Sequence, residues 1–322
     1  MRKFTRIIII IILELTFIIA SVSAIVFYGP FENLKKTVVG ASWNTLNHRF
    51  IARIFLSDKQ ILDILKGSYA QDPTENGEDI QILNFGMGHN GKLEFYDIKG
   101  GDFNGKMIIA HDPTRISVGY SANMPKSGET TSAIARKGGA VAAINAGGFT
   151  DKGWTGTGGA PMGFIMHQGK VIYNSSGSLN TKQDTIAFTD KGMLIVGRHT
   201  INQLIKYNVK EAVSFGPPLV VNGKPTIKNG DGGWGIGPRT AIGQRQDGEV
   251  LLLVIDGRGW NSLGATLKDA QQIMLKFGAV NAANLDGGSS TTMYMSGKVI
   301  NHPSDKLGER TVPTVFMVMP EE

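Results

Sequence analysis

Short apolar runs that alternate with glycine-rich turns fill the chain from Lys92 onward, and this pattern limits the possible folds most strongly. Examples are KLEFYDIKG, GKMIIAHDP, GMLIVG and GEVLLLVIDGR. The 42 glycines fall in clusters between such runs rather than in one low-complexity tract. The pattern predicts strands joined by tight turns. With 322 residues and 41% hydrophobic content, the chain can also bury a large core.

Two helices are expected among these strands. Thr130 or Thr131 can cap the first, and Thr266 can cap the second, which ends at Gly278. Each helix precedes an apolar strand that ends in a small polar motif, AVAAINAGGF or AVNAANLDGG. The sequence therefore predicts an α/β (α+β) fold, a single mixed-sheet domain with flanking helices at residues 80–322.

An apolar segment of about 21 residues, Ile7 to Phe27, follows three basic residues at the N-terminus and is long enough to cross a bilayer as a helix. We expect residues 1–27 to be a transmembrane anchor in the cell membrane. The basic residues before it favour a cytoplasmic N-terminus and an extracytoplasmic domain. A cleaved signal peptide is the alternative, because SVSA ends in small residues, although its apolar region would usually be shorter, about 7–15 residues.

Residues 28–79 are predicted to form a helical stalk and a linker. Apolar residues recur at helical spacing from Leu46 to Phe55 and from Ile61 to Leu65, and Ser57 can cap the second helix. The polar stretch from Ser68 to Asp79 would then connect the stalk to the domain.

Composition excludes several classes of site. The chain has no cysteine, so disulfides, thiolate nucleophiles and cysteine-bound metals are impossible. Its six histidines show no paired spacing, and we expect neither a metal nor a cofactor. The small net charge of +6 does not indicate binding of nucleic acid, although it is compatible with binding of an anionic cell-surface polymer. The oligomeric state stays open, a homo-oligomer included.

The motif NLDGGSSTT combines a carboxylate, two glycines and a row of hydroxyl residues. Consecutive amides from Gly287 to Ser290 could form an anion-binding nest beside Asp286, with further donors on the hydroxyl residues. The residues concerned are Gly287, Gly288, Ser289, Ser290 and Thr291. An ordinary Asp-Gly turn with solvated hydroxyls is the alternative. DGGSS is not the Gly-x-Ser-x-Gly element of serine hydrolases.

Three further motifs place polar groups at strand ends. GPRTAIGQ brings Arg239 and Thr240, and a guanidinium there could bind a phosphate with two hydrogen bonds or form a surface salt bridge. VIDGR brings Asp256, which could serve a site or cap a turn. AINAGG brings Asn145 and Gly147.

AINAGGF, GPRTAIG, VIDGR and above all NLDGGSSTTM, in this order, resemble the phosphodiester glycosidase family. The resemblance runs from about Lys92 to Met319, and the anchor with its stalk resembles bacterial membrane-bound members. It implies hydrolysis of a sugar-1-phosphate diester on an extracytoplasmic glycan or polysaccharide that contains phosphate.

The expected chemistry fits these motifs. Breaking the bond between the anomeric carbon and the phosphate oxygen releases a phosphate monoester, which needs little proton donation. We expect Asp286 or Asp256 to support the sugar cation or activate water, and Arg239 to stabilise the phosphate. Substrate contacts are expected from Asn145, Gly147, Thr240, and residues 287–291.

Two other functions are compatible with the motifs. A non-catalytic module for an anionic polysaccharide, acting in exopolysaccharide or envelope assembly, would keep the nest and the arginine without needing a reactive carboxylate. A phosphodiesterase that cuts the P–O bond would usually need metal ions, and the sequence shows no residues grouped to hold them.

If the N-terminal segment is a retained anchor, protease added to intact cells should digest the domain, and the undigested protein should fractionate with membranes. Immunoblots of the fractions give the result. Recovery of a soluble form that begins near Ile25 would show instead that the segment is a cleaved signal.

Overall fold

The computed structural model describes residues 2–44, 49–76, 80, 81, 83, 85, 90–150 and 157–321. Part of the predicted linker, residues 77–79, and the start of the first predicted stalk helix, residues 45–48, lie outside these ranges. Contacts divide the chain into two compact units. The helical unit comprises Met1–Tyr69 and Asn229–Gly235, and the sheet unit comprises Ala70–Lys228 and Ile236–Glu322.

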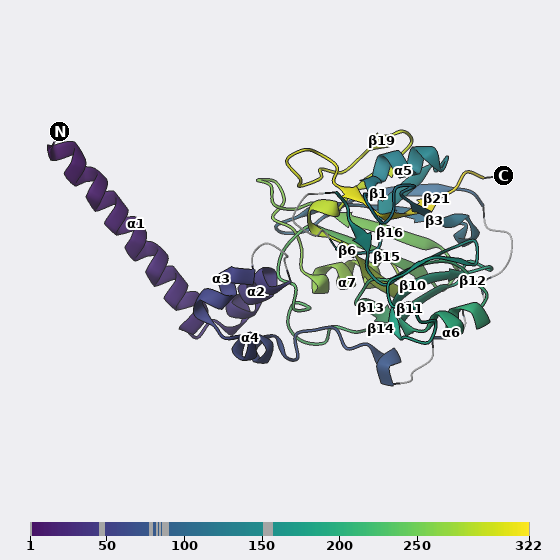
Figure 1. The fold of residues 1–322 in the computed structure, drawn as a ribbon, viewed down its shortest axis with the longest axis horizontal. Helices are drawn as coiled ribbons and strands as arrows, with labels where there is room; N and C mark the ends of the chain where they lie inside the picture. Colours follow the sequence, from purple (N-terminus) through teal and green to yellow (C-terminus); the bar gives the residue numbers. More distant parts are fainter. Residues whose placement is uncertain are drawn as a thin grey trace. The chain divides into compact units, whose positions relative to one another are not determined.

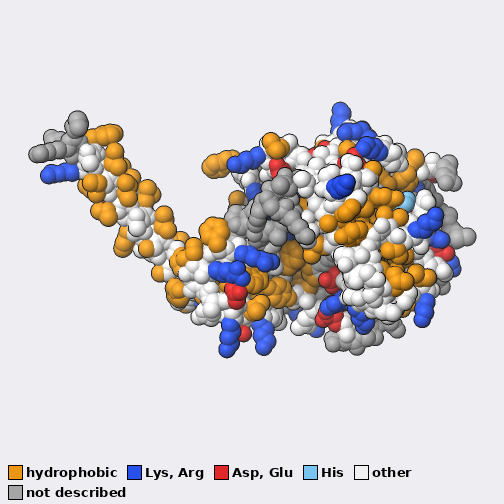
Figure 2. All heavy atoms as spheres, viewed as in Figure 1, with side chains coloured by type: hydrophobic (Ala, Val, Ile, Leu, Met, Phe, Trp, Pro, Cys, Tyr) orange, Lys and Arg blue, Asp and Glu red, His pale blue; other side chains and the backbone are white. Residues whose placement is uncertain are grey.

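The first helix of the helical unit, α1 (Arg2–Tyr28), exposes most of its apolar side chains, although Phe27 near its end is buried. Figure 2 shows hydrophobic side chains along most of its length. Phe4–Tyr28 is long and apolar enough to cross a membrane, and it is the one helix with this property among the described residues. A retained anchor and a signal sequence both have such a helix.

Three shorter helices pack beside its end: α2 (Glu32–Trp43), α3 (Arg49–Phe55) and α4 (Asp58–Leu65). Their core contains Val39, Ile61 and Leu65. Ser57 begins α4 with reciprocal hydrogen bonds to Gln60, as expected from the sequence. The loop Asn229–Gly235 belongs to the same unit, where the Asn44 side-chain amide donates to the Gly233 carbonyl at 2.6 Å.

The sheet unit is built from antiparallel strands. Within the described residues, its largest sheet has seven, in the order β1 (Leu93–Lys99), β2 (Asn104–Ala110), β16 (Val250–Ile255), β15 (Arg239–Arg245), β17 (Ala279–Leu285), β13 (Pro218–Val221) and β14 (Lys224–Pro225). The central strands are buried on both faces, which explains their nearly continuous apolar sequences.

Two five-stranded sheets complete the core in the described part of the chain. One has the order β19 (Lys298–Val299), β18 (Met293–Met295), β5 (Ala142–Asn145), β21 (Thr314–Val318) and β3 (Ile116–Tyr120). The other has the order β11 (Leu194–His199), β10 (Gln183–Thr189), β12 (Val209–Val213), β8 (Phe164–His167) and β9 (Lys170–Asn174). Two small pairs join β4 (Glu129–Thr130) to β20 (Thr311–Val312) and β6 (Phe149–Thr150) to β7 (Ala160–Pro161).

One hydrophobic core joins all three large sheets. Leu252 of β16, Ile144 of β5 and Ile186 of β10 belong to the same buried cluster. The predicted fold class is therefore confirmed, because mixed helices and sheets surround a shared core. Figure 1 shows this unit with α5 (Thr131–Lys137) and α6 (Ile201–Lys206) at opposite edges.

Both predicted helices of this unit are present. Thr130 caps α5, and Thr266 caps α7 (Leu267–Lys276) with the help of Asp269. Gly278 follows α7 with a φ of +84°, a conformation that glycine adopts at helix ends. The sequence analysis missed α6 and β12, which are short and lack a long apolar run.

The register brings several strand ends to one edge of the seven-stranded sheet. Arg239 pairs with Ile255 and Thr240 pairs with Leu285. The start of β15 therefore lies beside the ends of β16 and β17, after which Asp256 and Asp286 follow. The Asp286 amide donates to the carbonyl of Ala146, directly after β5, at 2.9 Å. This bond connects the edge to the end of a strand in the second sheet.

Candidate active site

Asp286, a partly exposed residue, lies directly after β17. Loss of hydration raises its pKa to about 6. Hydrogen bonds from the Ser290 hydroxyl and the Gly287 amide, together with the positive charge of Arg310, oppose part of this shift. A carboxyl group with such a pKa can exchange a proton near neutral pH, as acid–base catalysis requires.

The glycines after Asp286 shape a tight turn rather than an open nest. Gly288–Ser290 form a 3₁₀ turn, and the amides of Gly288, Ser290 and Thr291 donate to the carbonyls of Pro238, Gly287 and Gly288. The Gly287 amide donates to Asp286 itself. The amides of Gly287, Gly288, Ser290 and Thr291 therefore already donate within the protein, and the anion-binding nest stays a prediction.

Glycine is required in this turn for two physical reasons. At Gly287, an added Cβ would lie 2.8 Å from the Pro238 carbonyl oxygen. At Gly288, the φ of +61° is one that other residues adopt only with strain. The turn can therefore pack against the start of β15 and hold Asp286 at the sheet edge.

Asn145 is fully buried and positions the backbone of Asp286. Its side-chain nitrogen donates to the Asp286 carbonyl at 2.5 Å. Its side-chain oxygen accepts hydrogen bonds from the Thr240 hydroxyl at 2.8 Å and from the Thr292 amide at 3.1 Å. Asn145 has no exposed surface and orients the loop through these bonds, and its predicted contact with the substrate stays a prediction.

Three other residues expected at the substrate are also buried. Thr240 and Thr291 expose almost no surface, and their hydroxyl oxygens lie 3.4 Å apart. Gly147 donates its amide to the Thr314 hydroxyl at 2.9 Å. These contacts join strand ends to one another, and the expected substrate contacts of the three residues stay predictions.

Both oxygens of the Asp256 carboxyl group have partners in the protein, and Oδ2 lies 3.4 Å from the His302 Nδ1. One carboxylate oxygen accepts from the Asn301 side-chain amide and from the His302 backbone amide, both at 3.0 Å. Asn301 also donates to the Thr291 carbonyl and accepts from the Met293 amide. The sequence analysis missed Asn301, which has no local motif but joins the loops that carry the two carboxylates.

Two arginines lie near Asp286. Arg258 donates to the Ser289 hydroxyl at 3.2 Å. Loss of hydration, followed by repulsion from Arg310, lowers the pKa of Arg258. Arg310 lies over the Phe149 ring, 5.2 Å from its centroid. Two cations that repel each other beside a carboxylate offer a favourable place for an anion between them. No motif pointed to Arg310.

Arg239 begins β15 and exposes only 6% of its surface. Its Nε donates to the Ala265 carbonyl at 2.9 Å, just before α7. This hydrogen bond orients the Arg239 side chain. Its part in catalysis stays a prediction.

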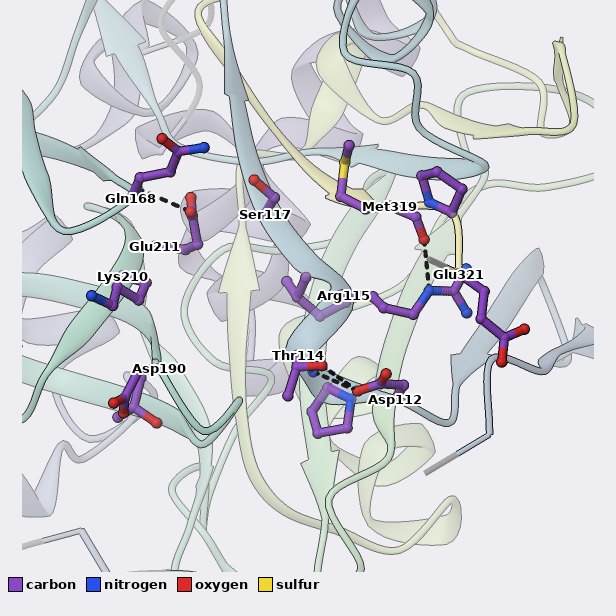
Figure 3. Close-up of a pocket in the computed structure, with 14 residues that line it drawn as sticks. Asp112, Thr114, Arg115, Ser117, Gln168, Asp190, Lys210, Glu211, Met319 and Glu321 are labelled. Atoms are coloured by element: carbon purple, nitrogen blue, oxygen red, sulfur yellow. Dashed lines mark hydrogen bonds between the residues drawn. The ribbon is translucent and has the colours of Figure 1, made fainter. Parts of the chain in front are cut away.

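Metal ligation has no visible basis in the described part of the chain, where no three acidic or histidine side chains are grouped to hold an ion. A cavity of about 860 Å³ is lined by none of the predicted site residues. Figure 3 shows it with Arg115, Asp190, Lys210 and Glu211 at its walls. Arg115 and Glu211 bond to nearby backbone groups there.

A sequence model of the phosphodiester glycosidase family matches residues 138–319, which include every residue proposed above for the site. The chain belongs to the phosphodiester glycosidase family. The resemblance found from the motifs is thereby confirmed.

Relatives with known sequences match parts of the chain. The SPbeta prophage-derived uncharacterized protein YomE of Bacillus subtilis (strain 168) is 30% identical over 208 residues, 60% of this chain and 30% of that protein. The bovine and human N-acetylglucosamine-1-phosphodiester alpha-N-acetylglucosaminidases are each 40% identical over 70 residues, 22% of this chain and 13% of theirs. The chain thus spans less than a third of the length of these relatives.

A solved structure supports the fold. The catalytic domain of the zebrafish N-acetylglucosamine-1-phosphodiester alpha-N-acetylglucosaminidase, auto-inhibited by its pro-peptide, matches with a TM-score of 0.64 and 22% identity. The match covers 78% of this chain and 91% of that domain. It therefore includes most of the sheet unit.

The raised pKa of Asp286 predicts a gain in stability when its charge is removed. Because the pKa is higher in the folded state, stabilisation present below pH 3.8 is lost as the pH rises through about 6. Asp286→Asn should therefore unfold at a higher temperature than the parent at pH 7, by roughly 1–3 kcal/mol in free energy, and at nearly the same temperature at pH 4.

Thermal unfolding of both proteins at the two pH values provides the measurement. Asp190→Asn is the matched control, since Asp190 is an exposed acid on another part of the sheet unit. An equal effect of the two substitutions at pH 7 would contradict the assigned desolvation of Asp286.

Proposed function

We propose that the protein hydrolyses a sugar-1-phosphate diester by cleaving the glycosidic C–O bond. The products are a free sugar and a phosphate monoester. The observation that carries the proposal is Asp286 at the end of β17, with its pKa raised to about 6 and two arginines nearby. Membership of the phosphodiester glycosidase family supports the reaction class.

In this proposal Asp286 acts at the anomeric carbon, either on the positive charge that develops there or through a water molecule that it deprotonates. Arg310 and Arg258 neutralise the departing phosphate. The geometry favours these two side chains over the amides of the turn for this role. Arg239 contributes a third positive charge from the start of β15. Asp256, held by Asn301 and His302, keeps the neighbouring loops in place.

The proposed setting is a membrane surface, with α1 as a single-pass anchor and the sheet unit on the extracytoplasmic side. The substrate would be a glycan or polysaccharide that contains phosphate. The length and composition of α1 support the anchor. The names of the mammalian relatives make N-acetylglucosamine 1-phosphodiesters the first probes to use.

Cleavage in water enriched in oxygen-18 identifies the bond that breaks. Because Asp286 would repel an attacking group at phosphorus but stabilise positive charge at carbon, we expect label in the released sugar and none in the phosphate monoester. Mass spectrometry of the phosphate product is decisive, since the free sugar also exchanges oxygen with solvent.

Label in the phosphate monoester would establish P–O cleavage and refute a glycosidase. The binding-module alternative makes a different prediction. In that case no sugar-1-phosphodiester is turned over, and binding of an anionic glycan is the same for the parent and for Asp286→Asn.

Arg310 is predicted to tune Asp286 as well as bind phosphate. Its positive charge lowers the pKa of Asp286, so Arg310→Gln should move the acidic limb of the kcat/KM profile to higher pH and raise KM by about tenfold or more. Arg310→Lys should retain most of the pH profile but not the affinity, because an ammonium group lacks the two-pronged geometry.

Arg198→Gln serves as the control, since Arg198 pairs with Glu75 away from the site. The assigned role of Arg310 would be wrong if its glutamine variant kept the parental profile and KM.

A further inference from the structure

Glu309, the residue directly before Arg310, is bound by the start of α5. Its Oε2 accepts a hydrogen bond from the Ser132 backbone amide at 2.9 Å, and its Oε1 accepts from the Ser132 hydroxyl at 2.5 Å. Two bonds from one residue to an ionised carboxylate fix both its distance and its orientation. Ser132 exposes only 4% of its surface, so water competes little for these bonds.

The backbone on either side of Glu309 and Arg310 gives limited support. Residues 306–308, just before them, are exposed. Just after them comes β20, which has two residues and pairs with the equally short β4. The bonds of Glu309 to Ser132 therefore provide a fixed point between an exposed turn and a short strand pair.

Ser132 is itself held firmly. Its hydroxyl oxygen accepts from the Arg136 guanidinium at 3.3 Å and lies 3.3 Å from the hydroxyl of Thr130, the residue that caps α5. The buried side of α5 packs with β21 in one hydrophobic cluster, and Figure 1 shows the helix beside that strand. The start of α5 can thus transmit the position of the core to Glu309.

We propose that Ser132 is a positioning residue for the phosphate site, since it holds Arg310 in place through Glu309. This inference rests on the proposed function, in which Arg310 binds the phosphate beside Asp286. Ser132 acts through Arg310 and has no contact with the substrate in this role. It lies outside the motifs AINAGG, GPRTAIGQ, VIDGR and NLDGGSSTT, so no site motif contains it.

A contact that only stabilises the fold is the alternative, and Thr200 offers a matched comparison. Its hydroxyl accepts from the Gln203 amide at 3.1 Å at the start of α6. Figure 1 shows α6 at the opposite edge of the sheet unit from α5. Ser132→Ala and Thr200→Ala each remove one hydroxyl at a helix start without changing the charge of the protein. They differ in whether Arg310 is affected.

The test uses the full chain in detergent and the methyl ester of N-acetylglucosamine 1-phosphate. Ser132→Ala should raise KM by about fivefold and move the acidic limb of the kcat/KM profile to higher pH, as expected for a displaced Arg310. Thr200→Ala should lower the unfolding temperature but retain the parental KM and pH profile.

A double substitution shows whether Ser132 acts through Arg310. In the Arg310→Gln protein, Ser132→Ala should raise KM no further, because two residues that act through one group have non-additive effects. A further fivefold rise in that background would overturn the proposal. So would a parental KM and pH profile in Ser132→Ala alone.

If the parent does not hydrolyse the ester, the proposed reaction fails and titration of Asp286 decides the positioning role separately. Carbon-13 NMR of aspartate-labelled protein gives its pKa, and Asp286→Asn identifies the signal. Because the charge of Arg310 lowers the pKa of Asp286, Ser132→Ala should raise that pKa, and Arg310→Gln should raise it further. An unchanged pKa in Ser132→Ala overturns the proposal.

Discussion

The buried amide of Asn145 joins the strand ends on which the candidate site depends. It contacts Asp286 after β17, Thr240 on β15 and Thr292 before β18, so one side chain connects two sheets. A buried amide that lost any of these partners would leave an unsatisfied polar group, at a cost of roughly 1–3 kcal/mol. The network therefore favours one arrangement of the loop that carries the carboxylate.

The turn from Gly287 to Ser290 extends this constraint to the backbone. Its amides bond within the protein, and its second glycine has a positive φ, so the conformation is set before any ligand binds. Positioned groups of this kind lower the cost of reorganisation during a reaction. The same bonds occupy several of these amides, and the proposed reaction therefore assigns the phosphate to arginine side chains.

Local patterns predicted the parts of the structure that depend on neighbouring residues. Ser57, Thr130 and Thr266 were recognisable as helix caps because a cap bonds to residues two or three positions away. The strand runs were recognisable from their apolar sequence and bounding glycines. Asp286 and Asp256 were found because each ends such a run.

The roles of Asn145 and Arg310 depend on contacts between distant segments. Asn145 lies 141 positions from Asp286 in the sequence, and only the register of β5 with β21 and β18 brings it there. Its complete burial could not be predicted from AINAGG alone. Arg310 precedes a strand of two residues and belongs to no motif, so its effect on Asp286 appears only once the chain is folded.

The two carboxylates at the sheet edge show how similar residues are given different tasks. Asp256 accepts two hydrogen bonds on one oxygen and exposes 7% of its surface. Asp286 is more exposed, and loss of hydration raises its pKa despite the bonds from Ser290 and Gly287. Differences in environment, rather than in residue type, assign acid–base roles in such pairs. In the proposed reaction, Asp286, the more exposed of the two residues, is the one that responds to the charge of a substrate.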